Sequence, residues 1–442
     1  MVKGILKRLK DNDLANKSFQ VLSIRVFGVV LSFTTLLLIT NNFQEDLVGK
    51  YNYLNSILVV LGSISLLGMN SSFLQFSGML DAQNEFQEVV NIYKKKIKIL
   101  IISCAVLISI YLLIKPLISE YLKEIQINVI LEKAFIGLFF YAISLLNYEV
   151  VRGLKKLIQS EFYRNILRFG TLFVVVIILI YLDREDLFLD LFIATFILTA
   201  IITSINVIII LKKITSKKAV GETRISYKKI LSVSLPMTIS FLALLIMQSI
   251  DVIMLKNYYE YHIVAYYGVV MRVSFLISIV LMSINAIISP LISKLFFSEQ
   301  KRDLIELMNK SIKLNFLLTL PLILLLLIFP KFVLSFFGDN YQDSSNVLII
   351  ILLGQIINVF SGSVGVYLNM TGRQLVFQRI LLVTLVINVL LNLTLIPVYD
   401  MVGAAISTSI SLIVWNITGV IYIYKKDKIL LFINRSVFYG SK

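Results

Sequence analysis

The sequence predicts an all-α polytopic membrane protein, with twelve transmembrane helices in two six-helix bundles related by a pseudo-two-fold axis along the membrane normal. Composition is the first observation behind this prediction. Of the 442 residues, 58% are hydrophobic and 15% are charged, whereas a soluble domain has about 45–50% and 25%. The mean hydropathy is +0.88. A soluble enzyme, a fibrous protein and a disordered chain are excluded, because none of them carries this balance.

Apolar runs of membrane-spanning length are the second observation. About 20 mostly apolar residues are needed to cross a bilayer as a helix, and such runs recur throughout the chain with polar clusters between them. The predicted spans are 18–40, 51–76, 97–118, 134–151, 165–182, 187–211, 231–255, 264–293, 314–330, 345–369, 376–399 and 402–424.

The distribution of basic residues is the third observation, and it sets the orientation. With the N-terminus inside, 33 of the 42 Lys and Arg residues fall in inside segments and 7 in outside segments, and the remaining two, Arg25 and Arg272, fall within spans. Cytoplasmic loops of membrane proteins carry an excess of Lys and Arg. The alternation therefore predicts twelve spans with both termini cytoplasmic.

The longest basic loop, 212–230, lies at the midpoint with six spans on each side. An even number of spans returns the chain to the same side, so the halves would be parallel repeats with substrate bound between them. The first ten residues place apolar side chains on one helical face, as an interfacial helix does. The predicted divisions are an interfacial cytoplasmic N-terminus 1–17, a six-helix bundle 18–211, the cytoplasmic linker 212–230, a second six-helix bundle 231–424 and a cytoplasmic tail 425–442.

The sequence has few of the residues and motifs that catalytic or metal sites require. Cys104 and His262 are the sole residues of their types, so neither a disulfide within the chain nor a Cys- or His-based metal site is expected. No glycine-rich phosphate loop is present, and the longest polar stretches hold about twenty residues, too few for a catalytic domain. We therefore expect no enzyme activity and no bound cofactor. We also expect no nucleic-acid partner, because basic residues in cytoplasmic loops account for the net charge of +16.

Four ionisable residues fall within the predicted spans: Arg25, Glu149, Asp251 and Arg272. At 1.5 Å per residue, Arg25 lies about 10 Å from the inner boundary and Arg272 about 12 Å from the outer one. Both are too deep for easy snorkelling, so we expect them to face a cavity. Glu149 is predicted about 3 Å from the inner end, one turn from Arg152, and Asp251 about 6 Å from the outer end.

Arginine at these depths suggests a permanently cationic site. The guanidinium group keeps its charge and presents a fork that matches phosphate or carboxylate oxygens. Asp251 has two alternative roles. It either neutralises Arg272, which we favour, or binds a proton or sodium ion. Glu149 is expected to be interfacial, with charge pairing or ion coupling as the alternative.

Several stretches after residue 231 resemble one family of transporters. They are Leu235-Pro-Met-Thr-Ile-Ser followed by Asp251-Val-Ile-Met-Leu, Tyr266-Tyr-Gly-Val-Val-Met-Arg272, Phe337-Gly-Asp-Asn-Tyr341, Leu368-Asn-Met-Thr-Gly372, and Asn388-Val-Leu-Leu-Asn-Leu-Thr-Leu-Ile-Pro397 with Gly403-Ala-Ala405. Together they resemble the polysaccharide flippases of the multidrug/oligosaccharidyl-lipid/polysaccharide exporter superfamily. The chain departs from the family at Asp400, where glycine is common.

The resemblance implies alternating access between two bundles in the cytoplasmic membrane of a bacterium. The implied cargo is an oligosaccharide on undecaprenyl pyrophosphate, moved from the inner to the outer leaflet for O-antigen, capsule or exopolysaccharide. Arg25 and Arg272 would contact the pyrophosphate, one from each half. Expected partners are this cargo, membrane lipids and, as a further candidate, the polysaccharide polymerase and chain-length machinery. Coupling to a proton or a sodium gradient stays open.

Three alternatives remain from the sequence. A drug/cation antiporter of the same superfamily would share the fold, but a carboxylate would be expected in the first span, which has Arg25 and no acid. Flippases of peptidoglycan precursors usually carry fourteen spans. A membrane glycosyltransferase or polymerase would need a large loop with acids or histidines, and this chain lacks one.

Overall fold

The computed structural model describes residues 12–82, 86–122, 125–215 and 225–433. No β-strand occurs among these residues. The interfacial helix predicted for the first ten residues lies outside them, as do residues 216–224 of the linker. The structure is therefore all-helical over the part of the chain on which the prediction can be judged.

The helices of the first half account for six predicted spans. They are α2 (Asn12–Asn42), α3 (Glu45–Leu66), α4 (Met69–Ala82), η1 (Phe86–Glu88), α5 (Val89–Leu122), α6 (Ile125–Gly153), α7 (Leu157–Glu161), η2 (Phe162–Leu167), α8 (Arg168–Leu182), η3 (Glu185–Leu187) and α9 (Phe188–Thr215). The second span is divided between α3 and α4, and the fifth runs through α7, η2 and α8.

The helices of the second half account for the other six. They are α10 (Tyr227–Tyr258), α11 (Tyr261–Phe297), α12 (Lys301–Ile328), α13 (Pro330–Ser335), η4 (Asp339–Ser344), α14 (Ser345–Ser361), α15 (Val364–Met370) and α16 (Gln374–Asp427). The tenth span runs through α14 and α15, and α16 contains the last two spans on either side of a kink.

Nine helical segments of the described chain are long and apolar enough to cross a membrane. One of them is α16, which contributes two spans because of its kink. The broken helix α3–α4 and the helix α10 cover the remaining two predicted spans. All twelve predicted spans therefore fall on helices, which confirms the prediction of a polytopic all-α membrane protein.

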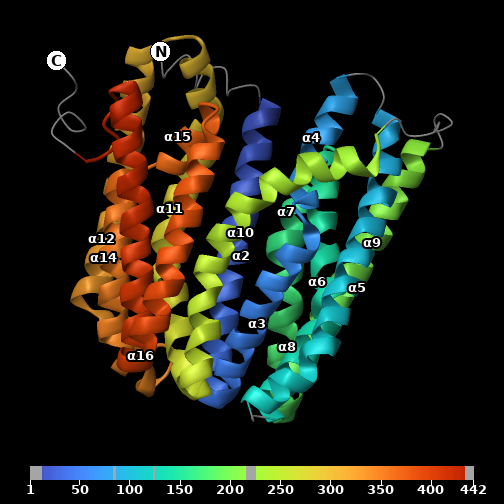
Figure 1. Cartoon of the computed structure of the whole chain (residues 1–442), viewed down its shortest axis with the longest axis vertical. Helices are drawn as coiled ribbons and strands as arrows, with labels where there is room; N and C mark the ends of the chain where they lie inside the picture. The colour runs from blue at the N-terminus through green and yellow to red at the C-terminus, as the bar shows by residue number, and fades with distance from the viewer. Residues whose placement is uncertain (1–11, 83–85, 123–124, 216–224, 434–442) are drawn as a thin grey trace. The chain divides into compact units, whose positions relative to one another are not determined.

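The chain divides into two compact units. Unit 1 contains Ile57–Thr238 and the described residues up to Phe43, and unit 2 contains Gln44–Ser56 and the described residues from Ile239 onward. In Figure 1 the ribbon of unit 1 is mostly blue to green and that of unit 2 mostly yellow to red. The division passes through helices α3 and α10, so each of these two helices belongs partly to both units.

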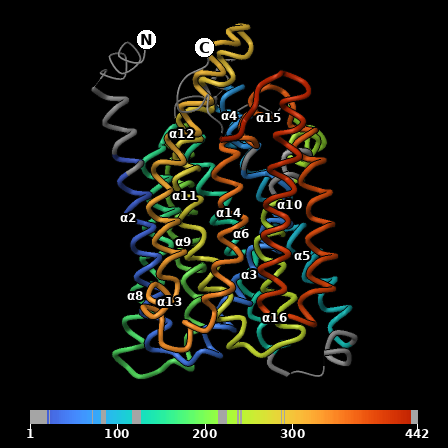
Figure 2. The backbone as a smooth tube through the Cα atoms, turned by 90° about the vertical axis from the view of Figure 1, so that its left-hand side faces the viewer, coloured from blue at the N-terminus to red at the C-terminus, as the bar shows by residue number. Residues whose placement is uncertain are grey.

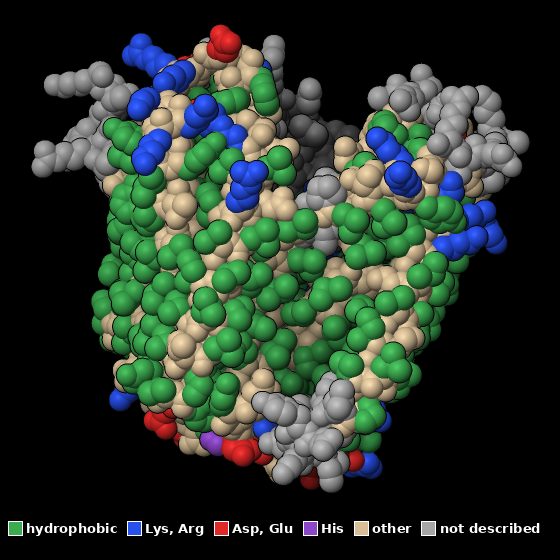
Figure 3. All heavy atoms as spheres, viewed as in Figure 1, with side chains coloured by type: hydrophobic (Ala, Val, Ile, Leu, Met, Phe, Trp, Pro, Cys, Tyr) green, Lys and Arg blue, Asp and Glu red, His purple; other side chains and the backbone are tan. Residues whose placement is uncertain are grey.

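Each unit has its own apolar core. In unit 1 the core includes Phe73, Leu100 and Leu146, and in unit 2 it includes Ile292, Leu368 and Leu381, none of which is more than 1% exposed. Apolar side chains also cover the outside, for example Tyr181 at 87% and Ile287 at 69% exposure. In Figure 3 hydrophobic side chains dominate the middle of unit 2, and Lys and Arg gather at its upper end. This distribution fits a bilayer around the middle of the unit.

Two helix breaks depend on residues with left-handed backbone. Between α3 and α4, Leu67 and Gly68 have φ values of 45° and 71°. In α16, Asp400 has φ 48° and ψ −131°, a conformation that glycine adopts most readily. The carboxylate of Asp400 accepts a hydrogen bond from the backbone N–H of Val402 at 3.1 Å. This contact supports an aspartate at the position where the resembling family commonly has glycine.

The kink at Asp400 reverses the chain. A Cβ atom added at Gly403 would lie 2.3 Å from the carbonyl oxygen of Leu395, although eight residues of a straight helix would separate the two by about 12 Å. Figure 2 shows the resulting pair of red helical arms within unit 2. The reversal brings residues of both arms to the neighbourhood of α10 and α11.

Candidate functional site

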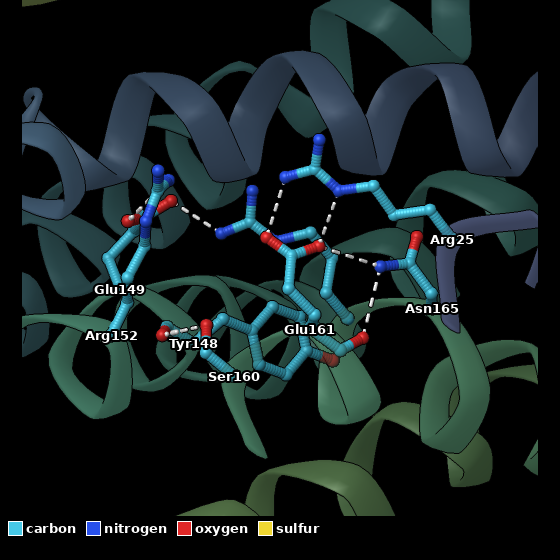
Figure 4. Close-up of polar contacts among 8 residues, drawn as sticks. Arg25, Tyr148, Glu149, Arg152, Ser160, Glu161 and Asn165 are labelled. Atoms are coloured by element: carbon cyan, nitrogen blue, oxygen red, sulfur yellow. Dashed lines mark hydrogen bonds and ion pairs between the residues drawn. The ribbon is translucent and has the colours of Figure 1, made fainter. Parts of the chain in front are cut away.

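Arg25 of α2 is held by a carboxylate of the same unit. Its Nε and Nη2 atoms donate to Glu161 Oε2 at 2.9 Å and to Oε1 at 2.7 Å. The Glu161 side chain is 1% exposed and that of Arg25 is 42% exposed. Asn165 Nδ2 donates a third hydrogen bond to Glu161 Oε2 at 3.1 Å. Figure 4 shows Arg25 reaching toward Glu161, with Asn165 beside the same carboxylate oxygen. A bidentate ion pair therefore joins α2 to α7.

Glu161 was missed by the sequence analysis, which assigned residues 152–164 to a cytoplasmic loop. The apolar segment in fact extends from Leu157 to Leu182. Reading the run from Leu157 would have placed Glu161 and Arg164 within the span, where buried charges need partners.

Glu149 belongs to the same network in unit 1. Its carboxylate accepts a hydrogen bond from Arg164, and the Nη1 atom of Arg152 lies 3.8 Å from its Oε2 atom. Arg152 is the residue that the helical spacing places beside Glu149. Only 11% of the Glu149 side chain is exposed, so its charge is offset by two arginines rather than by water.

A π-helical turn, η2, carries part of this network. Such turns occur mostly as local bulges in α-helices, and they often mark functional sites. Helix α2 approaches η2 closely, because a Cβ atom at Gly28 would lie 2.5 Å from the Asn165 Cβ atom. Glycine at this position therefore allows Arg25 to reach Glu161.

The charge balance of Arg25 and Glu161 leads to a stability prediction. Arg25→Ala leaves a buried carboxylate without its cation, and we expect it to lower the free energy of unfolding by about 2–4 kcal/mol. The lower part of this range reflects the partial exposure of Arg25. Adding Glu161→Gln should recover most of the loss, because a neutral amide replaces the buried charge. Unfolding of the purified protein in detergent measures both effects.

Arg184→Ala provides the matched control for this measurement. Arg184 also binds a carboxylate with two atoms, at 2.8 and 2.9 Å from Asp186, but both side chains are more than half exposed. Its loss should destabilise the protein far less than the loss of Arg25, because water screens an exposed ion pair. Equal destabilisation by Arg184→Ala and Arg25→Ala would contradict the assigned role of burial.

Arg272 of α11 has a different environment in unit 2. Its Nη2 atom donates to Tyr51 Oη at 3.2 Å and to Asn52 Oδ1 at 3.4 Å. The guanidinium carbon lies 5.2 Å from the centre of the Tyr51 ring, within range of a cation–π interaction. No carboxylate of the described residues lies within ion-pair distance of Arg272. Unlike Arg25, Arg272 therefore has only neutral partners and no carboxylate counter-ion among the described residues.

The segment around Tyr51 is tightly packed against α11. A Cβ atom at Gly49 would lie 1.8 Å from the Tyr261 carbonyl oxygen, and one at Gly268 would lie 2.3 Å from Asn52 Nδ2. Both glycines permit a helix approach that a larger side chain would block. The approach places Tyr51 and Asn52 within reach of Arg272.

Asp251 of α10 is completely buried and has only neutral hydrogen-bond partners. Tyr267 Oη donates to it at 2.7 Å and Asn392 Nδ2 at 2.6 Å, and Thr408 Oγ1 donates a third bond. The partners come from α11 and from both arms of α16. The reversal at Asp400 therefore assembles this cluster, which we call the Asp251 cluster.

The ion pair between Asp251 and Arg272, which the sequence analysis favoured, is not formed in the structure. Tyr267 faces Asp251, and Arg272 follows it by five residues. At 100° per residue, five residues rotate a helical position by about 140°, to the opposite side of α11. The two charges therefore lie on neighbouring helices without facing each other.

The chemistry of the Asp251 cluster suits a proton or a small hard cation. It combines a carboxylate with amide and hydroxyl oxygens, the oxygen types that hard cations prefer. Asn388 Oδ1 accepts a hydrogen bond from Asn392 at 3.3 Å, and Asn392 Oδ1 is buried without a hydrogen-bond partner. Buried polar atoms are normally satisfied, so an oxygen without a partner beside a carboxylate is consistent with a ligand site.

Comparison with known proteins gives matches along most of the chain. The family model described as "Polysaccharide biosynthesis protein" matches residues 14–296, and the MatE model matches residues 236–394. A proposed O-antigen transporter of Shigella flexneri is 31% identical over 180 residues, covering 40% of this chain and 42% of that protein. A capsular polysaccharide biosynthesis protein of Staphylococcus aureus is 24% identical over 201 residues, covering 45% of this chain and 50% of that protein. The matched regions thus span half or less of these relatives.

Two solved structures share the fold over nearly the whole chain. An inward-facing multidrug transporter of the MATE family, in the MOP superfamily, has a TM-score of 0.71 at 14% identity, covering 93% of this chain and 98% of that chain. The lipid II flippase MurJ in an inward closed conformation has a TM-score of 0.70 at 14% identity, covering 91% of this chain and 87% of that chain. These similarities show the fold. Since the polysaccharide model alone matches more than half of the sequence, the chain belongs to the polysaccharide biosynthesis protein family, and it is a multi-pass membrane protein with the fold of these two solved structures.

Proposed function

We propose that the protein is a flippase for an oligosaccharide repeat unit carried on undecaprenyl pyrophosphate. It moves this cargo from the cytoplasmic to the outer leaflet of the bacterial inner membrane, with both termini in the cytoplasm, for O-antigen, capsule or exopolysaccharide synthesis. The family match and the names of the two bacterial relatives support the cargo class. The polysaccharide polymerase and its chain-length machinery would act on the delivered cargo.

The observation that carries the proposal is the environment of Arg272. A cation that has only neutral partners can accept an anionic ligand without first giving up an ion pair. Phosphate oxygens match the geometry of a guanidinium fork. Tyr51 and Asn52 hold the guanidinium group in place, which reduces the entropy lost when a pyrophosphate binds.

Arg25 is the weaker of the two proposed pyrophosphate contacts. A phosphate would have to compete with Glu161, which already engages two of its nitrogens. The double variant Arg25→Ala/Glu161→Gln separates folding from function, because it removes the cation without leaving a buried charge. Its transport activity tests Arg25 directly.

Depletion of the protein in its native bacterium tests the function. We expect lipid-linked oligosaccharide to accumulate at the cytoplasmic face and surface polysaccharide to fall, with recovery when the wild-type gene is restored. Mass spectrometry of extracted lipids and staining of surface polysaccharide measure the two quantities. Unchanged polysaccharide together with increased sensitivity to cationic drugs would instead favour a drug/cation antiporter, a function that the MatE match also accommodates.

A further inference from the structure

Arg168 is a membrane-embedded arginine of unit 1 that belongs to neither the Arg25–Glu161 pair nor the Asp251 cluster. The apolar segment Leu157–Leu182 contains it, and Arg168 lies 11 residues after the first residue of this segment and 14 before the last. At 1.5 Å per residue it is therefore about 16 Å and 21 Å from the two ends. The distribution of basic residues had assigned Arg168 to the cytoplasmic end of the span, whereas the structure places it near the middle.

The charge of Arg168 is not offset by an acid. No carboxylate of the described residues lies within ion-pair distance of it, because Glu149 binds Arg164 and Glu161 binds Arg25. The guanidinium group also has no hydrogen-bond acceptor within the described part of the chain. Such a group carries five N–H donors and keeps its proton in proteins. Arg168 can therefore accept an anionic ligand without first giving up an ion pair.

Aromatic rings hold the guanidinium group in place. Its central carbon lies 5.5 Å from the centre of the Tyr141 ring of α6 and 5.9 Å from that of the Phe196 ring of α9. These two rings are buried and pack edge to face, with centres 5.1 Å apart. A cation within about 6 Å of a ring is attracted by the π-electrons, and this attraction uses none of the N–H donors. The rings thus position the cation and leave its donors for a ligand.

The local backbone explains how Arg168 comes to face these rings. It directly follows the π-helical turn η2, and its backbone N–H donates to the carbonyl oxygen of Tyr163, five residues earlier. The extra residue of a π turn rotates the positions that follow by about 100°, and such turns often occur at functional sites. Helices α6 and α8 both pack against α9 (Figure 1). A Cβ atom at Gly62 would lie 2.4 Å from the Tyr141 ring, so glycine makes room for that ring.

The side chain of Arg168 is open to the surroundings of the unit. It is partly exposed, and none of its nitrogens is among the enclosed polar atoms that lack a partner, whereas Nε of Arg164 is. Ionisable residues deep in membrane segments normally face polar pathways, and they mark the routes of substrates and ions. The guanidinium fork matches the oxygens of a phosphate group. These properties fit a contact for an oxyanion that crosses the membrane.

We propose that Arg168 binds a phosphate-type oxyanion of a membrane lipid through two guanidinium N–H donors, and that this oxyanion is the pyrophosphate of the cargo. The inference rests on the proposed function and extends it by a pyrophosphate contact in unit 1. Arg25 must be released from Glu161 before it can serve in this way. Arg272 has a setting like that of Arg168, since it lies over the ring of Tyr51 and has neutral partners. Each unit thus carries an arginine that an aromatic ring positions and that no described carboxylate neutralises.

Native mass spectrometry of the purified full chain tests this contact, with undecaprenyl pyrophosphate and phosphatidylglycerol as the two probes. We expect the wild type to bind undecaprenyl pyrophosphate more tightly. Arg168→Gln should weaken this binding about 30-fold, as expected for the loss of one partner from a desolvated charge contact. Its affinity for phosphatidylglycerol should change less than about twofold. The unfolding temperature should stay close to that of the wild type, because the variant leaves no carboxylate unpaired.

Two further variants make the measurement specific. Arg184→Gln is the matched control, since it removes another arginine of unit 1, which is more than half exposed, and binding should stay within about twofold of the wild type. Arg168→Lys keeps the charge and serves if Arg168→Gln does not fold. It should weaken binding about fivefold, because lysine has no bidentate fork. Unchanged binding in the folded Arg168 variants, or equal losses in Arg168→Gln and Arg184→Gln, would overturn the proposal.

The two probes and Arg272→Gln separate this contact from the proposed function. Equal affinity of the wild type for both probes would contradict a pyrophosphate cargo and would remove the contact at Arg168 with it. Weakened undecaprenyl pyrophosphate binding in Arg272→Gln but not in Arg168→Gln would leave the proposed function standing and overturn only the contact. An equal loss of both probes in Arg168→Gln would assign Arg168 to a phospholipid headgroup, which also overturns the proposal.

Discussion

Replacing Arg272 with alanine is expected to reduce flipping of the lipid-linked oligosaccharide by about 30-fold or more. The reason is that removal of one partner from a charge-assisted contact with a phosphate costs about 2 kcal/mol or more. Arg272→Lys should retain part of the activity, because lysine keeps the positive charge but cannot form the bidentate hydrogen bonds of a guanidinium group. Surface polysaccharide in the native host, at equal amounts of protein in the membrane, measures the effect.

Arg379→Ala is the control for this change. Arg379 lies in the same unit and is exposed on α16, so its loss removes the same charge without touching the proposed contact. Activity should stay within about twofold of the wild type, as for most surface substitutions. Normal export by Arg272→Ala, or an equal defect in both variants, would be incompatible with an anion contact at Arg272.

The membrane-spanning pattern could be predicted from the sequence because it depends on local composition. Twenty apolar residues cross a bilayer wherever they stand in a chain, and the alternation of basic loops adds a second, independent signal. The predicted span 51–76 runs through the break between α3 and α4 at Leu67 and Gly68, since the break leaves the hydropathy of the span unchanged.

The partners of the membrane charges could not be predicted in the same way, because they depend on which helical faces meet. Glu161 is 136 residues away from Arg25 in the sequence, and Tyr51 is 221 residues away from Arg272. Hydropathy and helical rise placed Asp251 and Arg272 on neighbouring helices, about 6 Å and 12 Å from the outer boundary, which does not determine the rotation of either helix. A rotation of about 140° between Tyr267 and Arg272 separates the predicted pair.

Part of the Asp251 cluster could be predicted from the spacing of polar residues along a helix. Asn388 and Asn392 are four residues apart and therefore share a face of α16, and a pair of amides on one face of a membrane helix normally has a polar partner. Thr408 lies beyond the kink at Asp400. Its approach to Asp251 depends on a chain reversal that hydropathy alone does not specify.

Replacing Asp251 with asparagine is expected to preserve the fold while removing the dependence of transport on an ion gradient. The carboxylate has only neutral partners, and an amide of the same shape can accept hydrogen bonds at the oxygen that remains. Asp251 has no cationic partner, so its replacement leaves no buried cation unpaired. The large loss of stability that follows the breaking of a buried ion pair is therefore not expected. Cargo flipping in proteoliposomes, with and without an imposed sodium or proton gradient, measures the coupling.

Asp339→Asn is the control, since Asp339 lies in the same unit and is exposed. It should leave gradient dependence unchanged. If the Asp251→Asn protein also responds to both gradients as the wild type does, Asp251 has no coupling role. Misfolding of the variant would show instead that the carboxylate is structural.

The variant Thr408→Val distinguishes sodium binding from proton binding at the Asp251 cluster. Valine keeps the shape of threonine and removes one hydroxyl oxygen next to Asp251. A sodium ion uses several oxygen ligands, and its affinity depends on their number, so the sodium concentration needed for half-maximal transport should rise about tenfold or more. A proton needs only the carboxylate. If the Asp251 cluster binds a proton, proton-driven transport should persist in Thr408→Val and disappear in Asp251→Asn. Loss of sodium-driven transport in both variants would instead identify the cluster as a sodium site.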